Sequence, residues 1–391
     1  MEFKINKDNW EKVTLGEIVF EPKETAKDII AEGFEHIVGL EHIVSGDVHL
    51  RNSFSNDTDT TFTKVFRAGD ILFGRRRAYL KKAAQASFNG VCSGDITVMR
   101  ANDKLDVRLL PFVIHNEKFF DYAVKHSAGG LSPRVKFKDL ANYEFLLPPK
   151  DQQAELADLL WAMDEVIEKD LEVLERLEVL YNSQLKNIFI ENSYNANEVS
   201  VKELGTVSTS GVDKKINSSE EIINLVNYMD VYGNKSKIID SSLEFMKVSA
   251  KENQIKTFQV NKGDVLFTPS SETKDDIGHS CVVVEDLEKT LYSYHLVRLS
   301  FNDKYDIDLN FKRFMFNNPK VLNQFTLKSK GVTRMTLSLE DFYSTVTLMP
   351  KNNEQKDIAL ILDNSLKLIK ELESKLQSSK ALQKALINQM F

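Results

Sequence analysis

The chain has 391 residues, of which 42% are hydrophobic and 28% are charged, a composition typical of a folded globular protein with room for two ordinary domains. No run approaches 18 apolar residues, and the first residues, MEFKINKDNW, lack an apolar signal core, so we expect neither a transmembrane helix nor a secretory leader. Cys92 and Cys281 are the only cysteines and no CxxC pair is present, so we expect no disulfide framework and no metal site. These features predict a cytoplasmic protein that does not bind membranes.

The net charge of −7 argues against nonspecific nucleic-acid binding by charge alone. The excess acid is local: residues 149–192 carry 4 basic and 11 acidic side chains, whereas residues 351–391 carry 7 and 5. These two segments therefore attract each other electrostatically.

Residues 1–149 form the first predicted globular unit. The runs DILF, ITVMR and YEFLLP are rich in β-branched and aromatic residues and predict strands, and apolar residues three or four apart predict a helix over 109–126. Residues 150–192 are predicted as one long helix, because Pro148-Pro149 precede them and Asp151–Ile190 contain no Pro or Gly and carry an apolar stripe with near-heptad spacing. Polar residues 191–197, ENSYNAN, are predicted to link the two halves.

The second half of the chain repeats the first. Residues 193–350 contain strand-like DVLFT, CVVVE and HLVRLSF and a helical pattern over 309–327, and residues 351–391 repeat the long helix. Matched segments include GDILF with GDVLF, VCSGDITVMR with LYSYHLVRLS, and Leu15-Gly16 with Leu204-Gly205. Each long helix would span roughly 60 Å with an exposed stripe, so we expect the two helices to pack together; two unrelated helical hairpins are the alternative.

Enzyme motifs are missing. No G-x-G occurs, and Pro148-Pro149 lack the flanking polar and aromatic residues that a base-flipping amino-methyltransferase uses. Gly69 and Gly74 have P-loop spacing, but arginines replace the Lys-Ser/Thr pair, and there is no HExxH. The Glu-x-Lys triplet at 272–274 is too short to indicate a nuclease. A duplicated binder therefore fits better than a catalyst.

The order of unit, long helix, unit and long helix, with GD-[IV]-LF in each unit and a Gln-containing helix start after each proline, resembles the specificity subunit of type I restriction-modification enzymes. The resemblance implies an α+β fold: two repeated mixed α/β target-recognition domains, separated by two long antiparallel coiled-coil-like helices with pseudo-two-fold symmetry. It implies a non-catalytic chain that reads one half of a bipartite double-stranded DNA target with each domain. It also implies two methyltransferase subunits as partners, which would carry S-adenosylmethionine, and optional restriction subunits with a translocase; no cofactor is expected in this chain.

Residues that diverge after the shared GD[IV]LF are the first candidates for DNA contact, because arginine forks to guanine and lysine neutralises phosphate. In the first unit these are Arg75, Arg76, Arg77, Lys81 and Lys82, and in the second Ser270, Ser271, Thr273 and Lys274. Glycine-containing loops before each long helix supply the second set: Ser132, Arg134, Lys136, Lys328, Lys330, Thr333 and Arg334. A solvated basic surface, or an arginine that caps a strand end, is the structural alternative.

The competing function is a two-module coiled-coil adaptor that binds proteins. It predicts no salt-dependent affinity for DNA, whereas a DNA reader requires it.

Overall fold

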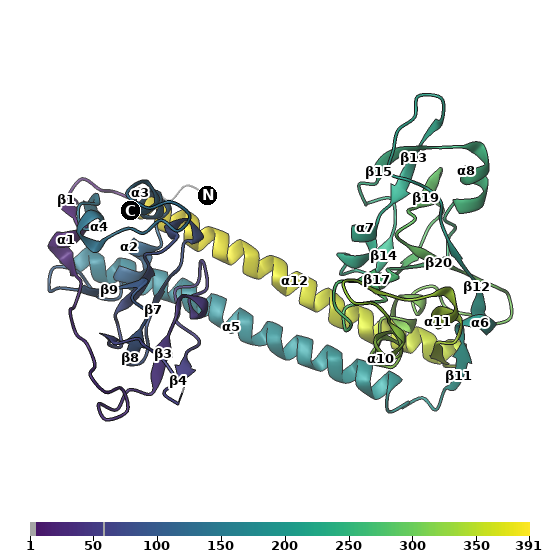
Figure 1. Ribbon diagram of the computed structural model, residues 1–391, viewed down its shortest axis with the longest axis horizontal. Coiled ribbons are helices and arrows are strands. Elements are labelled where there is room, and N and C mark those ends of the chain that lie inside the picture. Colours follow the sequence, from purple (N-terminus) through teal and green to yellow (C-terminus); the bar gives the residue numbers. More distant parts are fainter. Residues whose placement is uncertain (1–4, 58) are drawn as a thin grey trace. The chain divides into compact units, whose positions relative to one another are not determined.

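The computed structural model describes residues 5–57 and 59–391, and the chain divides into two compact units (Figure 1). Unit 1 consists of Met1–Glu172 together with Ser374–Phe391, and unit 2 consists of Val173–Glu373. Each unit therefore combines one globular fold with parts of both long helices. None of the helices in the described residues combines the length and hydropathy needed to span a lipid bilayer.

Unit 1 is built on two four-stranded sheets with strand orders β2-β9-β6-β7 and β4-β3-β8-β5, and a separate antiparallel pair, β1 with β10. The strands are β1 (Glu11–Thr14), β2 (Val19–Phe20), β3 (His36–Val38), β4 (Phe54–Ser55), β5 (Lys64–Phe66), β6 (Ile71–Gly74), β7 (Ala83–Gln85), β8 (Gly90–Cys92), β9 (Ile96–Ala101) and β10 (Glu144–Leu147). The predicted strands DILF, ITVMR and YEFLLP correspond to β6, β9 and β10.

The short helices of unit 1 are α1 (Leu15–Ile18), η1 (Leu40–His42), η2 (Ala78–Leu80), α2 (Leu110–Ile114), α3 (Glu117–Lys125) and α4 (Phe137–Leu140). The sequence predicted one helix over 109–126, but the structure breaks it into α2 and α3. The cause is Asn116, which has extended backbone angles and accepts a hydrogen bond from the Lys118 amide at 2.8 Å, as a helix N-cap does.

Unit 2 repeats this topology. Its sheets have the orders β12-β20-β16-β18-β14 and β15-β13-β19, with the antiparallel pairs β11-β22 and β17-β21. The strands are β11 (Asn197–Ser200), β12 (Gly205–Thr209), β13 (Glu221–Val226), β14 (Ile238–Ile239), β15 (Met246–Ala250), β16 (Val265–Phe267), β17 (Ser270–Ser271), β18 (Ser280–Val283), β19 (Thr290–Tyr292), β20 (Val297–Phe301), β21 (Met335–Thr336) and β22 (Val346–Met349). The run β12-β20-β16-β18 repeats β2-β9-β6-β7, and β13 pairs in parallel with β19 as β3 does with β8.

The short helices of unit 2 are α6 (Val201–Leu204), α7 (Tyr228–Tyr232), α8 (Glu252–Phe258), α9 (Lys312–Met315), α10 (Pro319–Lys328) and α11 (Leu339–Tyr343). The helical pattern predicted over 309–327 is again two helices. Asn318 caps α10 by accepting from the Val321 amide at 3.2 Å, so it plays the part of Asn116 in unit 1.

One sequence match between the halves is wrong in register. Backbone pairing places Glu11 opposite Leu147 and Asn197 opposite Met349, and α1 and α6 begin after capping residues Thr14 and Ser200. Leu15 therefore corresponds to Val201, and not to Leu204 as the Leu-Gly match suggested.

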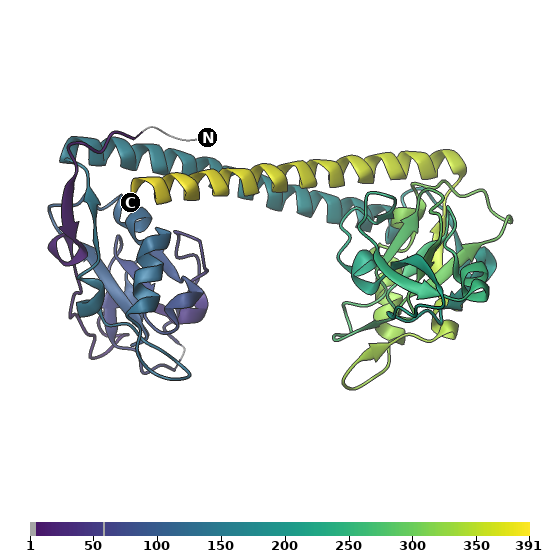
Figure 2. The ribbon, with the colours of Figure 1, turned by 90° about the horizontal axis from the view of Figure 1, so that it is seen from above.

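The two long helices are α5 (Lys150–Phe189) and α12 (Asn352–Met390). In unit 1 the end of α12 lies beside the start of α5 (Figures 1 and 2), where the Gln383 side-chain amide donates to the Leu160 carbonyl at 3.4 Å. In unit 2 the end of α5 meets the start of α12, where the Ser365 hydroxyl donates to Gln184 at 2.8 Å. The antiparallel pairing predicted for the helices is therefore confirmed.

A glutamine near each helix start ties the helix to its own unit. The Gln153 side chain donates to the Pro148 carbonyl at 2.9 Å and accepts from the Asp106 amide at 2.8 Å. Gln355 makes the same pair of bonds with Pro350 at 3.0 Å and Asp308 at 2.8 Å. The shared Pro-to-Gln spacing therefore fixes the direction in which each helix leaves its unit.

The cores of both units are aromatic and include residues from both long helices. In unit 1, Phe73, Phe112 and Phe119 are fully buried and pack in one cluster with residues of the α12 end: Leu386, Ile387, Met390 and Phe391. In unit 2, Phe267, Phe314 and Phe325 cluster with α5 and α12 residues that include Leu185, Phe189, Ile358 and Leu362. Burying each such side chain contributes about 1.5–3 kcal/mol, so the helices are integral parts of the units.

Candidate nucleic-acid interface

The Gly-Asp pair of each repeat is a turn that enters a buried strand. Gly69 and Gly263 both have φ of +92°, a left-handed conformation that favours glycine. The Asp70 carboxylate accepts from the Arg67 amide at 2.8 Å, and the Asp264 carboxylate accepts from the Asn261 amide at 3.0 Å. Strands β6 and β16 follow directly, so these shared residues form the scaffold, as the sequence predicted.

Two loops that are distant in sequence meet beyond this strand in unit 1. We call residues 74–82 the first loop and residues 127–136 the second loop. The Val135 amide donates to the Arg75 carbonyl at 3.0 Å, and the Arg77 amide donates to the Pro133 carbonyl at 2.8 Å. The two stretches predicted separately as DNA contacts thus form one surface in unit 1.

The same loops meet in unit 2, where the first loop is residues 268–276 and the second loop is residues 329–338. The Leu337 amide donates to the Pro269 carbonyl at 2.9 Å, as Val135 donates to Arg75. Strand β17 of the first loop also pairs with β21 of the second, which places Ser270 opposite Thr336. The frame of the two loops is therefore common to both units.

A turn before β9 and β20 supplies a third element. In unit 1 the Asp95 amide donates to the Ser93 hydroxyl at 3.2 Å, and in unit 2 the His295 amide donates to the Ser293 hydroxyl at 3.2 Å. The Asp95 carbonyl accepts from the Arg75 amide at 3.0 Å, which joins this turn to the first loop. We call the three elements together the junction of each unit.

The junction of unit 1 is organised by a carboxylate. Asp95 accepts from Arg134 Nε at 2.7 Å and contacts Arg76 Nη1 at 3.4 Å, and Arg76 Nε donates to the Ser132 hydroxyl at 2.6 Å. The hydrogen bond from Arg134 is the main reason that the pKa of Asp95 lies below its ordinary value. Both arginine side chains stay about two-fifths exposed, 44% for Arg134 and 40% for Arg76.

The junction of unit 2 reverses the loop origin of the arginine–serine pair. Arg334 of the second loop donates from Nε to the hydroxyl of Ser270 in the first loop at 3.1 Å. In unit 1 the arginine comes from the first loop and the serine from the second. The hydrogen bond occupies the same place in both frames, with its donor and acceptor exchanged.

Arg134 and Arg334, both predicted as DNA contacts, do not occupy equivalent positions in the two units. Lys136 and Ser338 precede the equivalent helices α4 and α11, and Val135 and Leu337 make the same backbone bond. Counting back from these residues makes Arg334 equivalent to Ser132, and Thr336 equivalent to Arg134.

The remaining predicted residues fall into two groups. The side chains of one group are exposed: Arg77, Lys136, Thr273, Lys274, Lys330 and Thr333. In the other group the polar atom is held within the fold: Lys82 donates to the Leu40 carbonyl at 2.6 Å, Lys328 donates to the Ser344 and Thr345 hydroxyls at 3.0 Å, and Ser271 is buried. Within the described residues, the Arg75 Nε atom is buried without a hydrogen-bond partner. We leave Lys82, Lys328 and Ser271 out of the candidate surface.

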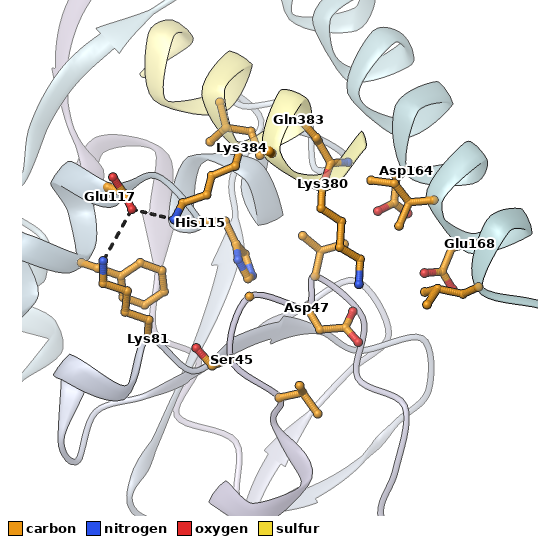
Figure 3. A pocket seen from close by; sticks show the side chains of 18 of the residues that line it. Ser45, Asp47, Lys81, His115, Glu117, Asp164, Glu168, Lys380, Gln383 and Lys384 are labelled. Carbon is orange, nitrogen blue, oxygen red and sulfur yellow. Dashed lines mark ion pairs between the residues drawn. The ribbon is translucent and has the colours of Figure 1, made fainter. Parts of the chain in front are cut away.

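Lys81 lies at the wall of a cavity of about 370 Å³ in unit 1 (Figure 3). There Glu117 lies between Lys384 at 2.8 Å and Lys81 at 3.8 Å, and on the opposite side His49 Nε2 contacts Asp164 at 2.6 Å. His115 is neutral there because burial lowers its pKa to about 4. Since most of the charged groups are paired with one another, we interpret this cavity as the place where unit 1 holds α5 and α12.

Sequence reasoning missed the third element of the junction. Asp95 and His295 lie in the matched segments VCSGDITVMR and LYSYHLVRLS, so the repeat itself contained the signal. Basic side chains are the usual sequence signal of DNA contact, and an aspartate or a histidine in a turn does not give that signal.

Residues 7–178 match the family model of the type I restriction modification DNA specificity domain. The chain therefore carries a domain of this class, in the region that forms the fold of unit 1 and most of α5. This match confirms the resemblance seen in the sequence for residues 7–178.

Over 137 residues, which are 34% of this chain, the sequence is 30% identical to the type I restriction enzyme EcoDI specificity subunit of Escherichia coli, and the match spans 30% of that protein. A solved chain from work on complex assembly and conformational transition of the type I R-M system aligns with a TM-score of 0.59 and 17% identity, over 100% of this chain and 98% of its own. The S subunit of a type I restriction-modification system from M. genitalium aligns with a TM-score of 0.56 and 14% identity, over the same shares. These two likenesses concern the fold, and they confirm the predicted α+β class.

Proposed function

We propose that this chain is the DNA-specificity subunit of a type I restriction-modification enzyme and that it catalyses no reaction itself. In this proposal each unit reads one half of a bipartite target in double-stranded DNA. The observation that carries the proposal is the pair of junctions. The backbone bond from Val135 to Arg75 repeats as the bond from Leu337 to Pro269. The side chains at equivalent positions differ, with Arg76 replaced by Ser270 and Ser132 by Arg334. A common frame with different donors and acceptors is what two readers of different base sequences require.

The exposed cations of the loops would hold the DNA backbone. Arg77 and Lys136 in unit 1 and Lys274 and Lys330 in unit 2 have exposed side chains next to the junction residues. Lysine and arginine side chains at such places neutralise phosphates, which makes affinity fall with salt. Arg76 and Arg334 are the better candidates for base contact, because a hydrogen bond to serine already fixes the orientation of each.

The long helices offer surface to protein partners. On α5, Leu159 and Val166 of unit 1 are each 46% exposed, and on α12, Leu360 and Leu368 of unit 2 are 61% and 52% exposed. Apolar side chains that a helix leaves exposed are typical of interaction sites. We propose that two methyltransferase subunits bind there and that these partners carry S-adenosylmethionine and methylate adenine. The assembly would work in the cytoplasm, and restriction and translocase subunits would be optional additions.

Methylome sequencing of a host that expresses this chain with the methyltransferase subunit of its system tests the proposal. The expected result is methyladenine at one two-part motif with a fixed gap, lost when this chain is omitted. A methylation pattern that does not depend on this chain contradicts the proposal, and so does methyl transfer or cleavage by the isolated chain.

A second measurement separates a DNA reader from the protein-binding adaptor. The affinity of the assembled complex for duplexes that contain the motif is measured from 50 to 200 mM salt. A DNA reader loses affinity steeply over this range, because counterions are released on binding. An adaptor shows neither the affinity nor the salt dependence.

A further inference from the structure

The turn before β9 and β20 contains the largest chemical difference between the two junctions. Ser93 and Ser293 make the same hydrogen bond to the backbone two residues later, so the turns have the same local geometry. The two residues that follow this serine are Gly94-Asp95 in unit 1 and Tyr294-His295 in unit 2. The same place in the frame therefore holds an anion in one unit and two rings in the other.

In unit 1 the carboxylate of Asp95 orients the arginines of both loops. It binds Nε and Nη2 of Arg134, at 2.7 and 3.3 Å, and Nη1 of Arg76 at 3.4 Å. Within the described residues, Nη1 of Arg134 and Nη2 of Arg76 have no hydrogen-bond partner, and both side chains are partly exposed. These donors are thus held in fixed directions for acceptors outside the protein, such as the O6 and N7 atoms of guanine.

The Asp95 carboxylate also favours recognition of bases over recognition of phosphates at this site. Asp95 cancels one of the two positive charges, and its own charge repels a phosphate placed at the same point. A site that only attracted the DNA backbone would do better without it. An arginine held by a carboxylate attracts phosphate less strongly, but its remaining N–H groups point in fixed directions. This arrangement favours a hydrogen bond to a base edge, where direction matters.

In unit 2 the equivalent position is aromatic and neutral. The rings of Tyr294 and His295 lie 3.9 Å apart between centroids at 38°, and the Tyr294 side chain is 47% exposed. Burial, with Lys214 and Arg334 nearby, lowers the pKa of His295, so its ring offers one donor and one acceptor. Arg334 has a serine and no carboxylate as its partner in the described part of the chain. The chemistry available to a base differs from that of unit 1.

We propose that Asp95 in unit 1 and His295 in unit 2, which occupy equivalent positions, determine which bases each unit accepts. Asp95 acts as a positioning residue for Arg76 and Arg134, and His295 with Tyr294 forms a base-contacting pair. This inference rests on the proposed function, because it assigns the specificity of the same junctions.

Two substitutions test it by methylome sequencing in the host described above: Asp95→Asn, which keeps the shape and removes the charge, and His295→Ala. Asp95→Asn should broaden the accepted bases in one half of the motif only, and His295→Ala should broaden them in the other half only. Asp103→Asn is the matched control, because Asp103 is an exposed carboxylate of unit 1 that lies outside the junction. It should leave both halves unchanged.

Binding measurements give the size of the effect. With the assembled complex, Asp95→Asn should reduce the discrimination between the target and a single-base variant about tenfold. It should not weaken affinity for unrelated duplex DNA, and should strengthen it at low salt, because a negative charge beside the two arginines is removed. A purely structural role for Asp95 would weaken binding to all duplexes equally, and that outcome overturns the inference. Thermal unfolding identifies a variant that fails to fold, in which case His295→Ala decides.

The two proposals fail in different ways. If the unsubstituted chain directs no motif at all, the proposed function is wrong. If the unsubstituted chain directs a two-part motif and neither folded variant alters it, the function stands and the role of Asp95 and His295 is wrong.

Discussion

The exchanged arginine–serine pair predicts a measurable coupling between two loops of unit 1. Arg76→Ser and Ser132→Arg are made singly and together, so that the double variant has the arrangement of unit 2. A hydrogen bond to a charged group contributes about 1.5–3 kcal/mol when water is excluded. Arg76 donates to Ser132 at 2.6 Å but its side chain is 40% exposed, so we expect about 1 kcal/mol.

Each single substitution should therefore lower the free energy of unfolding of unit 1 by about 1 kcal/mol. The change at position 132 does so because it also adds a third cation beside Arg76 and Arg134. In the double variant an arginine of the second loop can donate to a serine of the first loop, as Arg334 does to Ser270 at 3.1 Å. The double variant should then regain about the stability of the unsubstituted chain, which is about 2 kcal/mol above the sum of the single effects. If the bond is lost and not replaced, the double variant lies only about 1 kcal/mol above that sum.

Urea unfolding followed by tryptophan fluorescence isolates the relevant unit, because Trp10 and Trp161 are the only tryptophans and both belong to unit 1. The reversed exchange in unit 2, Ser270→Arg with Arg334→Ser, is the control and should leave this fluorescence transition in place. A double variant that stays about 1 kcal/mol or more less stable than the unsubstituted chain would refute the equivalence of the two hydrogen bonds.

Three further outcomes are expected. Leu386→Ala, at a fully buried position of α12 in the core of unit 1, should lower the stability of that unit by about 2–5 kcal/mol in the same fluorescence assay, and an unchanged transition would place α12 outside the core. The hydrogen bond to Asp164 raises the pKa of His49 above its ordinary value. The stabilisation of unit 1 by this pair is therefore complete below about pH 6.5 and is lost as the pH rises through the higher folded pKa. Urea titrations of the unsubstituted chain and of His49→Gln at acidic and alkaline pH check this, and the variant should lack the part of the stability change that is due to His49. Arg77→Ala should lower the slope of log affinity against log salt by about one while the methylated motif stays the same, and a changed motif would show that Arg77 reads bases.

Much of the fold could be predicted from the sequence, because its strongest signals are local. The near-heptad apolar stripes, the prolines before them and the repeated GD[IV]LF predicted the long helices and the duplication. The break in each shorter helix depends on one asparagine whose side chain caps the next turn, and helical periodicity continues across such a break. The register of the Leu15 match depended on backbone pairing with a strand more than a hundred residues away, which a short sequence match cannot show.

The candidate site was predicted in part for a similar reason. Basic and glycine-rich stretches identified the first and second loops, and the structure brought them together. The role of Asp95 depends on Arg76 and Arg134, which approach it from two other loops, and no spacing in the sequence encodes that contact. The equivalence of Ser132 with Arg334 likewise required hydrogen bonds, because the residue types of the two loops differ at most equivalent positions.

The composition of unit 1 has a consequence for how the protein is made. Its core includes Leu386, Ile387, Met390 and Phe391, which leave the ribosome after the whole of Val173–Glu373. At about 5–20 residues per second, those roughly 200 residues take about 10–40 s to synthesise. During that delay the nascent first fold lacks part of its apolar lining, and a chaperone that shields such surfaces would find its substrate there, whereas unit 2 has all its segments as soon as Glu373 emerges.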